Sequence, residues 1–254
     1  MQLNYKSFGQ GDPLVILHGL FGSLDNWQTI AKQLAEFYTV FIIDLRNHGR
    51  SPHVNEHSYE LMAEDVFNFM SDNWIYGANV IGHSMGGKVA IRLALDYPEQ
   101  VNKLIIADMG IKQSERGHEN IFEAMFDLDL LNLDSRTIID NQLKTRITEL
   151  GVRQFLLKNL SRRKEGGYKW KMNLLALHEH YDEILKEIES DSTFDNLTLF
   201  LRGGNSNYVL NEDFEDIQTL FPNSKLETIE GAGHWLHAEK PKEFVQYVRA
   251  FLED

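Results

Sequence analysis

The chain has 254 residues, of which 43% are hydrophobic and 11% are aromatic, so it can build a sizeable core and lacks the composition of a disordered protein. Its formal net charge of -13 argues against nucleic-acid binding, because an acidic surface repels phosphate, and against docking on anionic lipid. It has no cysteine, which excludes disulfides, thiol nucleophiles and thiolate metal ligands.

The first part of the chain alternates short apolar runs with longer amphipathic stretches. The apolar runs predict strands at 14–17, 38–43, 79–81 and 101–107. The amphipathic stretches predict helices over 27–37, from an N-cap at Ser58 onward, and over 88–97, where Pro98 follows. Since these strands are apolar on both faces, they favour an α/β fold with a mostly parallel, doubly wound sheet covered by helices on each side.

The alternation stops after Asp108, and residues 111–190 have helical patterns with no convincing strand. The periodic apolar positions there are Phe122, Met125, Phe126, Leu130, Leu131, Phe155, Leu156, Leu160, Ile184, Leu185 and Ile188. The alternation resumes with strands at 197–201 and 225–229, a helix near 212–221, and a final helix that begins near Pro241. We therefore expect a core domain made of 1–110 and 191–254, with an all-helical insertion at 111–190.

The strongest motif is Gly82-His83-Ser84-Met85-Gly86, which lies between a predicted strand and a predicted helix. A chain that reverses so sharply strains the backbone of the serine, and only small residues fit two positions to either side. The turn would hold the Ser84 hydroxyl clear of the sheet edge, in front of a helix N-terminus. The motif alone also occurs in ordinary glycine-rich turns, but the strand-turn-helix setting favours a nucleophile.

A serine hydroxyl needs a base to take its proton, and ten histidines compete for that role. His234 follows the last predicted strand in a loop flanked by Gly231 and Gly233. The chain order serine, acid, histidine requires a late histidine, and open α/β sheets place their sites at the ends of strands. We therefore expect His234 to be the general base, against the alternative of an ordinary loop histidine. Four others are expected to support their own loops: His18, His48, His83 and His237.

Several segments together resemble the α/β-hydrolase superfamily. They are the turn at His18-Gly19, the elbow around Ser84, the loop at 44–51 and the late Gly231-Ala232-Gly233-His234. The stretches 202–209 and 233–241 are similar to the bacterial YbfF-type esterases. The resemblance covers nearly the whole chain and is weakest in the insertion. It implies an α/β-hydrolase fold with a helical cap inserted after the sixth strand, and a serine esterase without metal or organic cofactor.

The resemblance also implies an oxyanion hole. In the family, two backbone amides hold the negative oxygen of the tetrahedral intermediate, and here they would belong to Leu20 and Met85. Such donors are each worth roughly 2.7–4 kcal/mol. Gly19 and Gly22 would let the first loop bend inward, although an ordinary turn is the alternative interpretation.

The acid departs from the family pattern. Most members carry it after the strand that follows the insertion, but the loop at 203–209 contains no carboxylate. Asp108 is the alternative, because it ends the strand beside the nucleophile strand, and the YbfF-type esterases resemble this arrangement. We expect Asp108 to be the acid, with Asp213 or Glu212 as the fallback and a helix-capping role for Asp108 as the alternative.

The insertion is expected to cover Ser84 as a cap. An acyl pocket would take side chains from both parts of the chain, namely Phe21, Phe122, Met125, Phe126, Trp170 and Trp235. The insertion residues among them would otherwise form its own core. The basic run at 162–164 would attract an anionic substrate such as acyl-CoA, or would simply be a solvated face.

The sequence thus predicts a serine carboxylesterase for short- to medium-chain acyl esters, with an acyl-enzyme intermediate. A thioesterase or a carbon–carbon bond hydrolase with the same triad is one alternative, and a weakly catalytic ligand receptor on this fold is another. Residues 1–6 do not resemble the start of a signal peptide, and no apolar run approaches the roughly 18 residues of a membrane span. We expect a cytoplasmic monomer or homodimer whose partner is a small acyl ester or thioester.

Overall fold

The computed structural model describes residues 1–254 and contains a seven-stranded sheet with the order β1-β3-β2-β4-β5-β8-β9. The strands are β1 (Tyr5–Phe8), β2 (Asp12–Leu17), β3 (Tyr38–Ile43), β4 (Ala78–His83), β5 (Val101–Ala107), β8 (Thr198–Gly203) and β9 (Ser224–Ile229). Within this sheet only the pairing of β1 with β3 is antiparallel. The mostly parallel sheet predicted from the apolar runs is therefore confirmed.

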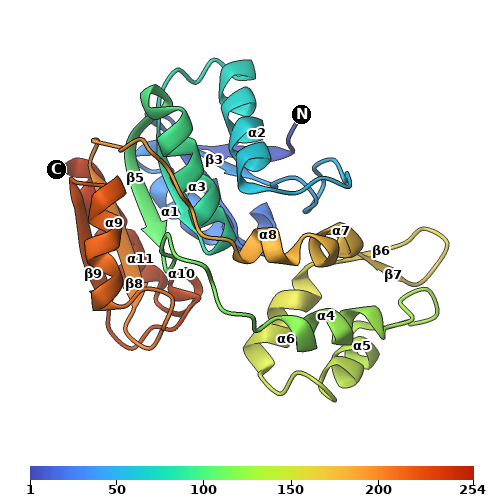
Figure 1. Ribbon diagram of the computed structural model, residues 1–254. Helices are drawn as coiled ribbons and strands as arrows, with labels where there is room; N and C mark the ends of the chain where they lie inside the picture. Colours follow the sequence, from blue (N-terminus) through green and yellow to red (C-terminus); the bar gives the residue numbers. More distant parts are fainter.

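Helices cover both faces of this sheet (Figure 1). One face packs against α2 (Tyr59–Asp72), α3 (Met85–Asp96) and α9 (Phe214–Leu220), and the other against α1 (Gln28–Leu34), α10 (Leu236–Glu239) and α11 (Pro241–Glu253). Alternate residues of a strand point to opposite faces, so in β2 Val15 and Leu17 join the first cluster while Leu14 and Ile16 join the second. Because helices shield both faces of the sheet from water, these strands do not alternate between apolar and polar residues.

Most helix boundaries follow the predicted signals. Ser58 caps α2, its side chain accepting a hydrogen bond from Leu61 N, and Pro241 is the first residue of α11. Helix α3 begins at Met85, three positions before the predicted start, because the elbow turn runs directly into the helix. The sequence pattern missed this turn of helix because Gly86 and Gly87 are weak helix formers.

The insertion between β5 and β8 contains α4 (Glu119–Phe126), α5 (Arg136–Leu143), α6 (Leu150–Lys158), α7 (Leu174–Glu179) and α8 (Tyr181–Leu185). The prediction that it is all-helical is wrong, since β6 (Leu160–Arg162) and β7 (Tyr168–Trp170) form an antiparallel hairpin. Strands of three residues are too short to produce a readable alternation. Gly166 and Gly167, both at positive φ, form the hairpin turn.

The two segments that connect the insertion to the core lie next to each other. Ser114 N donates to Leu185 O and Ile188 N donates to Ile111 O, so the outgoing and returning segments lie side by side. Five strands precede the insertion, so the expectation that it follows the sixth strand is wrong. Four of these five strands were predicted from the sequence, and β1 is the additional one. Its buried side chains join the same apolar cluster as α2 and α3. The division into 1–110 with 191–254 and 111–190 stays a prediction.

None of the helices combines the length and the apolar character that crossing a lipid bilayer requires.

Candidate active site

Ser84 occupies a sharp turn between β4 and α3, with φ 54° and ψ -123°. A positive φ is strained for a side chain larger than glycine and persists only where the surroundings enforce it. A Cβ added to Gly82 would lie 2.2 Å from Gly86 O, and one added to Gly86 would lie 2.5 Å from the carbonyl oxygens of Leu17 and His18. The chain therefore has no room for any other residue at these two positions, as the sequence argument required.

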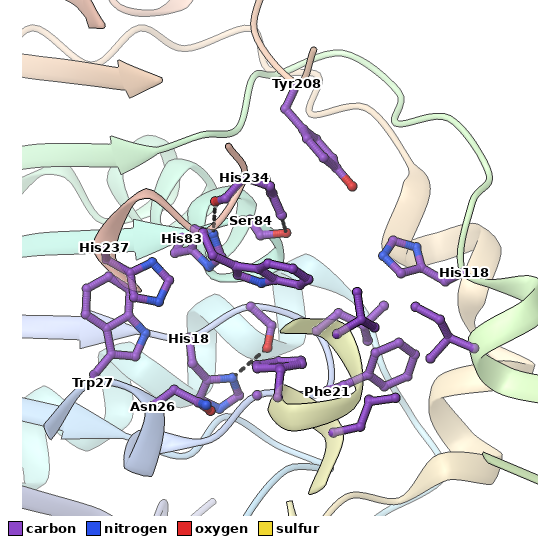
Figure 2. A pocket seen from close by; sticks show the side chains of 18 of the residues that line it. His18, Phe21, Asn26, Trp27, His83, Ser84, His118, Tyr208, His234 and His237 are labelled. Carbon is purple, nitrogen blue, oxygen red and sulfur yellow. Dashed lines mark hydrogen bonds between the residues drawn. The ribbon is translucent and has the colours of Figure 1, made fainter. Parts of the chain in front are cut away.

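His234 lies in the loop between β9 and α10 and faces Ser84 (Figure 2). Its Nε2 is 3.0 Å from Ser84 Oγ, and its Nδ1 is 2.7 Å from Asp108 Oδ2. Since a carboxylate only accepts, Nδ1 carries the hydrogen and Nε2 presents its lone pair to the serine hydroxyl. This is the tautomer that a general base for Ser84 needs.

Asp108 directly follows β5, is fully buried, and has a φ of 51°. Gly203 N donates to its Oδ1 over 2.9 Å, while His234 Nδ1 and Ser206 Oγ both donate to its Oδ2. A buried carboxylate is tolerable only when hydrogen bonds replace its lost water, and these three donors do so. Ser84 N also donates to Ala107 O, which fixes the end of β5 against the elbow.

The fallback acids lie elsewhere. Asp213 Oδ1 forms an ion pair with Lys112 at 2.9 Å, and Glu212 is exposed to solvent. The loop at 203–209, which has no carboxylate, instead supplies Ser206 as a donor to Asp108. Sequence reasoning missed this contact, because a serine in a polar loop gives no sign of its partner.

Where the sequence predicts an oxyanion hole, two backbone amides at and beside the elbow have no hydrogen-bond partner in the protein. Gly22 N donates to Gly19 O and closes a turn whose central residues are Leu20 and Phe21. Leu20 N donates to no group of the protein, and Met85 is the first residue of α3, where an N–H has no partner within the helix. Gly19 brings the turn close, since a Cβ there would lie 3.0 Å from Ser84 Cβ. Both amides are thus free for an oxyanion.

The neighbouring histidines are structural supports. His83 Nε2 donates to His234 O over 2.9 Å, and His18 Nδ1 donates to Gly19 O while its Nε2 accepts from Leu45 N. His237 stacks on Trp27 with ring centroids 4.2 Å apart, and burial lowers its pKa to about 3. Burial also lowers the pKa of His18 and His83, so these rings are neutral donors and acceptors. His48 Nδ1 likewise donates to Arg46 O within its own loop.

A cavity of about 210 Å³ lies above Ser84 and is lined by both core and insertion. The core contributes Phe21 and Trp235, as predicted, and also Tyr208, whose ring stacks on His234 at 4.0 Å. The insertion contributes Gly117, His118, Ile121, Val152, Phe155 and Leu156. Its largely apolar surface and its position over Ser84 make it the candidate substrate pocket.

Four of the predicted pocket residues do not line this cavity. Phe122 and Met125 are buried inside the insertion, Phe126 is 45% exposed, and Trp170 Nε1 donates to Met125 O. The pattern shows that a helix has an apolar face, but not whether that face meets a cavity or another helix. Residues 152, 155 and 156 of α6 are spaced so that they share one face of the helix, and this spacing could have indicated that they line the cavity together.

The basic run at 162–164 forms the turn end of the β6–β7 hairpin, at the outer end of the insertion (Figure 1). None of its residues lines the cavity. Arg163 lies 3.9 Å from Glu165, and Lys171 forms an ion pair with Asp25 at 3.1 Å. The interpretation as a solvated face fits this position better than the attraction of an anionic substrate.

The chain matches the family model described as alpha/beta hydrolase fold over residues 12–241. It is 38% identical to the sn-1-specific diacylglycerol lipase ABHD11 of Danio rerio, over 100% of this chain and 83% of that protein. It is 35% identical to Esterase YbfF of Escherichia coli (strain K12), over 95% of this chain and 93% of that protein. The solved structure of a marine microorganism esterase is 41% identical, with a TM-score of 0.96 over 98% of this chain and 99% of that one. The resemblance predicted from the sequence is confirmed.

Proposed function

The chain belongs to the α/β-hydrolase fold family, and from that premise we propose that it is a serine carboxylesterase for short- to medium-chain acyl esters. That it hydrolyses esters follows from its similarity to proteins named esterase and lipase. The observation that carries the mechanism is the unbroken line of hydrogen bonds from Ser84 Oγ through His234 to Asp108. This line ends at the floor of an apolar cavity that a small acyl ester fits.

In the first half-reaction His234 Nε2 takes the hydroxyl proton of Ser84 while Oγ attacks the ester carbonyl carbon. The carbonyl oxygen becomes an oxyanion, to which the amides of Leu20 and Met85 donate. When the tetrahedral intermediate collapses, the bond to the alcohol oxygen breaks and the imidazolium of His234 gives its proton to that oxygen. An acyl-enzyme and a free alcohol result.

In the second half-reaction water takes the place of the alcohol. His234 accepts a proton from the water, whose oxygen attacks the acyl carbon, and the bond to Ser84 Oγ breaks as Oγ regains a proton. The carboxylic acid product leaves. Asp108 holds the imidazole in the required tautomer and stabilises its charged form in both halves, without taking a proton itself.

The experiment compares p-nitrophenyl acetate, butyrate and octanoate, together with an acyl-CoA, on the wild type and on Ser84→Ala and His234→Ala. The proposal expects hydrolysis of at least one p-nitrophenyl ester and loss of that activity by at least about 10³-fold in both variants. If the enzyme hydrolysed only the acyl-CoA and none of the p-nitrophenyl esters, its substrate would be a thioester and not an ester. Binding without turnover of any compound would favour the receptor interpretation.

Location and assembly remain predictions from the sequence. A cytoplasmic location is tested by cell fractionation, and a monomer or homodimer by sedimentation at several concentrations.

A further inference from the structure

His118 enters the cavity from the insertion, on the side away from Ser84 and His234 (Figure 2). It is the residue before α4, and its ring lies between two aromatic rings. The ring centroids are 6.0 Å from Phe21 and 5.8 Å from Tyr181, both in edge contact. These contacts fix the orientation of the imidazole in the cavity wall.

The hydroxyl oxygen of Tyr181 determines which nitrogen of His118 carries the hydrogen. Gly117 N donates to this oxygen over 3.2 Å and His118 N donates to it over 3.1 Å. The same oxygen lies 2.8 Å from His118 Nδ1. A hydroxyl accepts two hydrogen bonds and has one hydrogen to give. Because the two amides fill its acceptor capacity, the hydroxyl donates to Nδ1, and the ring hydrogen is on Nε2.

The Nε2–H group has no hydrogen-bond partner in the protein, and Nε2 is not among the unpaired atoms that are fully buried. Burial first, and the electrostatic effect of His234 across the cavity second, lower the pKa of His118 to about 4, so the ring is a neutral donor at neutral pH. The hydroxyl of Tyr208, which lines the same cavity, also makes no hydrogen bond with the protein. The largely apolar cavity thus contains the Nε2–H group of His118 and the hydroxyl of Tyr208 as unpaired polar groups, in addition to the unpaired side-chain N–H groups of Asn26, Trp27 and Trp235 in its lining.

Unpaired donors in an apolar pocket discriminate between ligands, because a ligand without an acceptor leaves them unsatisfied. We propose that His118 is a specificity-determining residue whose Nε2–H donates to a substrate oxygen away from the scissile carbonyl. The preferred substrates are therefore esters that carry a further ether, hydroxyl or carbonyl oxygen in the acyl or the alcohol part. This inference rests on the proposed function and refines its substrate class.

The experiment replaces one methylene of an ester by an ether oxygen at four positions. Two comparisons change the acyl chain: p-nitrophenyl pentanoate with the ethoxyacetate and with the methoxypropanoate. Two change the alcohol: pentyl butyrate with ethoxyethyl and with methoxypropyl butyrate. The kcat/KM ratio of ether to alkyl ester is expected to be about fivefold lower in His118→Phe than in the wild type for at least one comparison. An unchanged ratio in all four overturns the proposal.

Two matched variants separate hydrogen bonding from packing. His118→Gln keeps an N–H donor of similar reach and is expected to recover most of the preference. Ile121→Val changes the volume of the same cavity wall without removing a donor, and its ratios are expected to stay within about twofold of the wild type. If Ile121→Val shifts the ratios as His118→Phe does, the effect is one of packing and the proposal fails.

A spectroscopic readout tests the tautomer without any substrate. Nitrogen-15 spectra of the imidazoles, assigned by comparing the wild type with His118→Gln, are expected to show His118 neutral and protonated at Nε2. A hydrogen on Nδ1 would contradict the proposal. If the wild type hydrolyses no ester, the proposed function fails; if it hydrolyses the alkyl esters and no ratio shifts, only the assignment of His118 fails.

Discussion

His234 Nδ1 donates to Asp108 Oδ2 over 2.7 Å, although 126 positions separate the two residues in the chain. The carboxylate comes from the end of β5, while the neighbouring strand β8 ends in a loop without an acid. Since β5 pairs with both β4 and β8, the ends of all three strands meet beside the nucleophile. An acid after either β5 or β8 therefore reaches the same histidine.

Exchanging Asp108 for Asn is expected to lower kcat by about 10⁴-fold, because an amide can donate to Nδ1 and favours the wrong tautomer of His234. Asp213→Asn is the matched control, since Asp213 lies in an ion pair with Lys112 away from the triad, and should leave kcat nearly unchanged. Steady-state kinetics on one p-nitrophenyl ester checks both. A larger loss in Asp213→Asn than in Asp108→Asn would show that the acid is misassigned.

Ser206→Ala removes one of the two side-chain donors to Asp108. We expect kcat to fall about tenfold with little change in KM, and the free energy of unfolding to fall by about 1.5–3 kcal/mol, as for other hydrogen bonds to charged groups. Asn207→Ala is the control, because Asn207 is exposed in the same loop. Urea unfolding and kinetics measure the two effects, and equal behaviour of the two variants would refute a positioning role for Ser206.

Gly86→Ala tests the steric account of the elbow. The added Cβ would lie 2.5 Å from two backbone oxygens, so we expect a loss of about 1–3 kcal/mol in unfolding free energy together with loss of activity. Gly151→Ala, in helix α6, places its Cβ in open space and is expected to stabilise by about 0.5–1 kcal/mol. Thermal unfolding of both variants gives the comparison, and a fully active, fully stable Gly86→Ala would contradict the account.

His237 predicts a specific pH dependence of stability. Burial first, and His234 and Lys158 after it, lower its pKa from the usual 6.5 of a histidine to about 3. Below pH 6.5 the unfolded chain binds a proton that the folded protein refuses, so this histidine costs stability progressively as the pH falls from 6.5 towards 3. At pH 4.5 the cost is about 3 kcal/mol, from two pH units at about 1.4 kcal/mol each.

His237→Phe keeps an aromatic ring over Trp27 but cannot titrate. Its stability should therefore fall less steeply than that of the wild type between pH 6.5 and pH 4.5. Urea unfolding at both pH values gives the change in unfolding free energy of each protein. Subtracting the change of the variant from that of the wild type removes the contribution of the carboxylates that the two proteins share. Parallel losses in the two proteins would mean that His237 does not resist protonation.

The parts of the site that local sterics dictate were predictable from the sequence. Gly82 and Gly86 flank a serine between a strand and a helix, and only one kind of turn satisfies that pattern. His234 followed from chain order, and Asp108 from the missing carboxylate after β8. Residues 82, 84 and 86 needed only their neighbours in the chain, whereas His234 and Asp108 also needed the order of the parallel strands and the resemblance to α/β-hydrolases and YbfF-type esterases.

The residues that were missed depend on how separate elements pack. Ser206 reaches Asp108 and Tyr208 stacks on His234 only because the loop after β8 folds back over the end of β5. The predicted pocket residues Phe122 and Met125 lie in the insertion core instead, while Phe155 of α6 faces the cavity. Tertiary packing decides whether the apolar side of a short helix lines a cavity or contacts another helix. The periodicity of the sequence does not distinguish these two cases.

The central claim is that Ser84 is a nucleophile activated by His234. The most direct measurement is labelling with a fluorophosphonate, followed by mass mapping of the modified peptide in the wild type and in His234→Ala. The account predicts a single adduct on Ser84 and labelling at least about 10³-fold slower in the variant. An adduct on another residue, or equally fast labelling of Ser84 in His234→Ala, would contradict it.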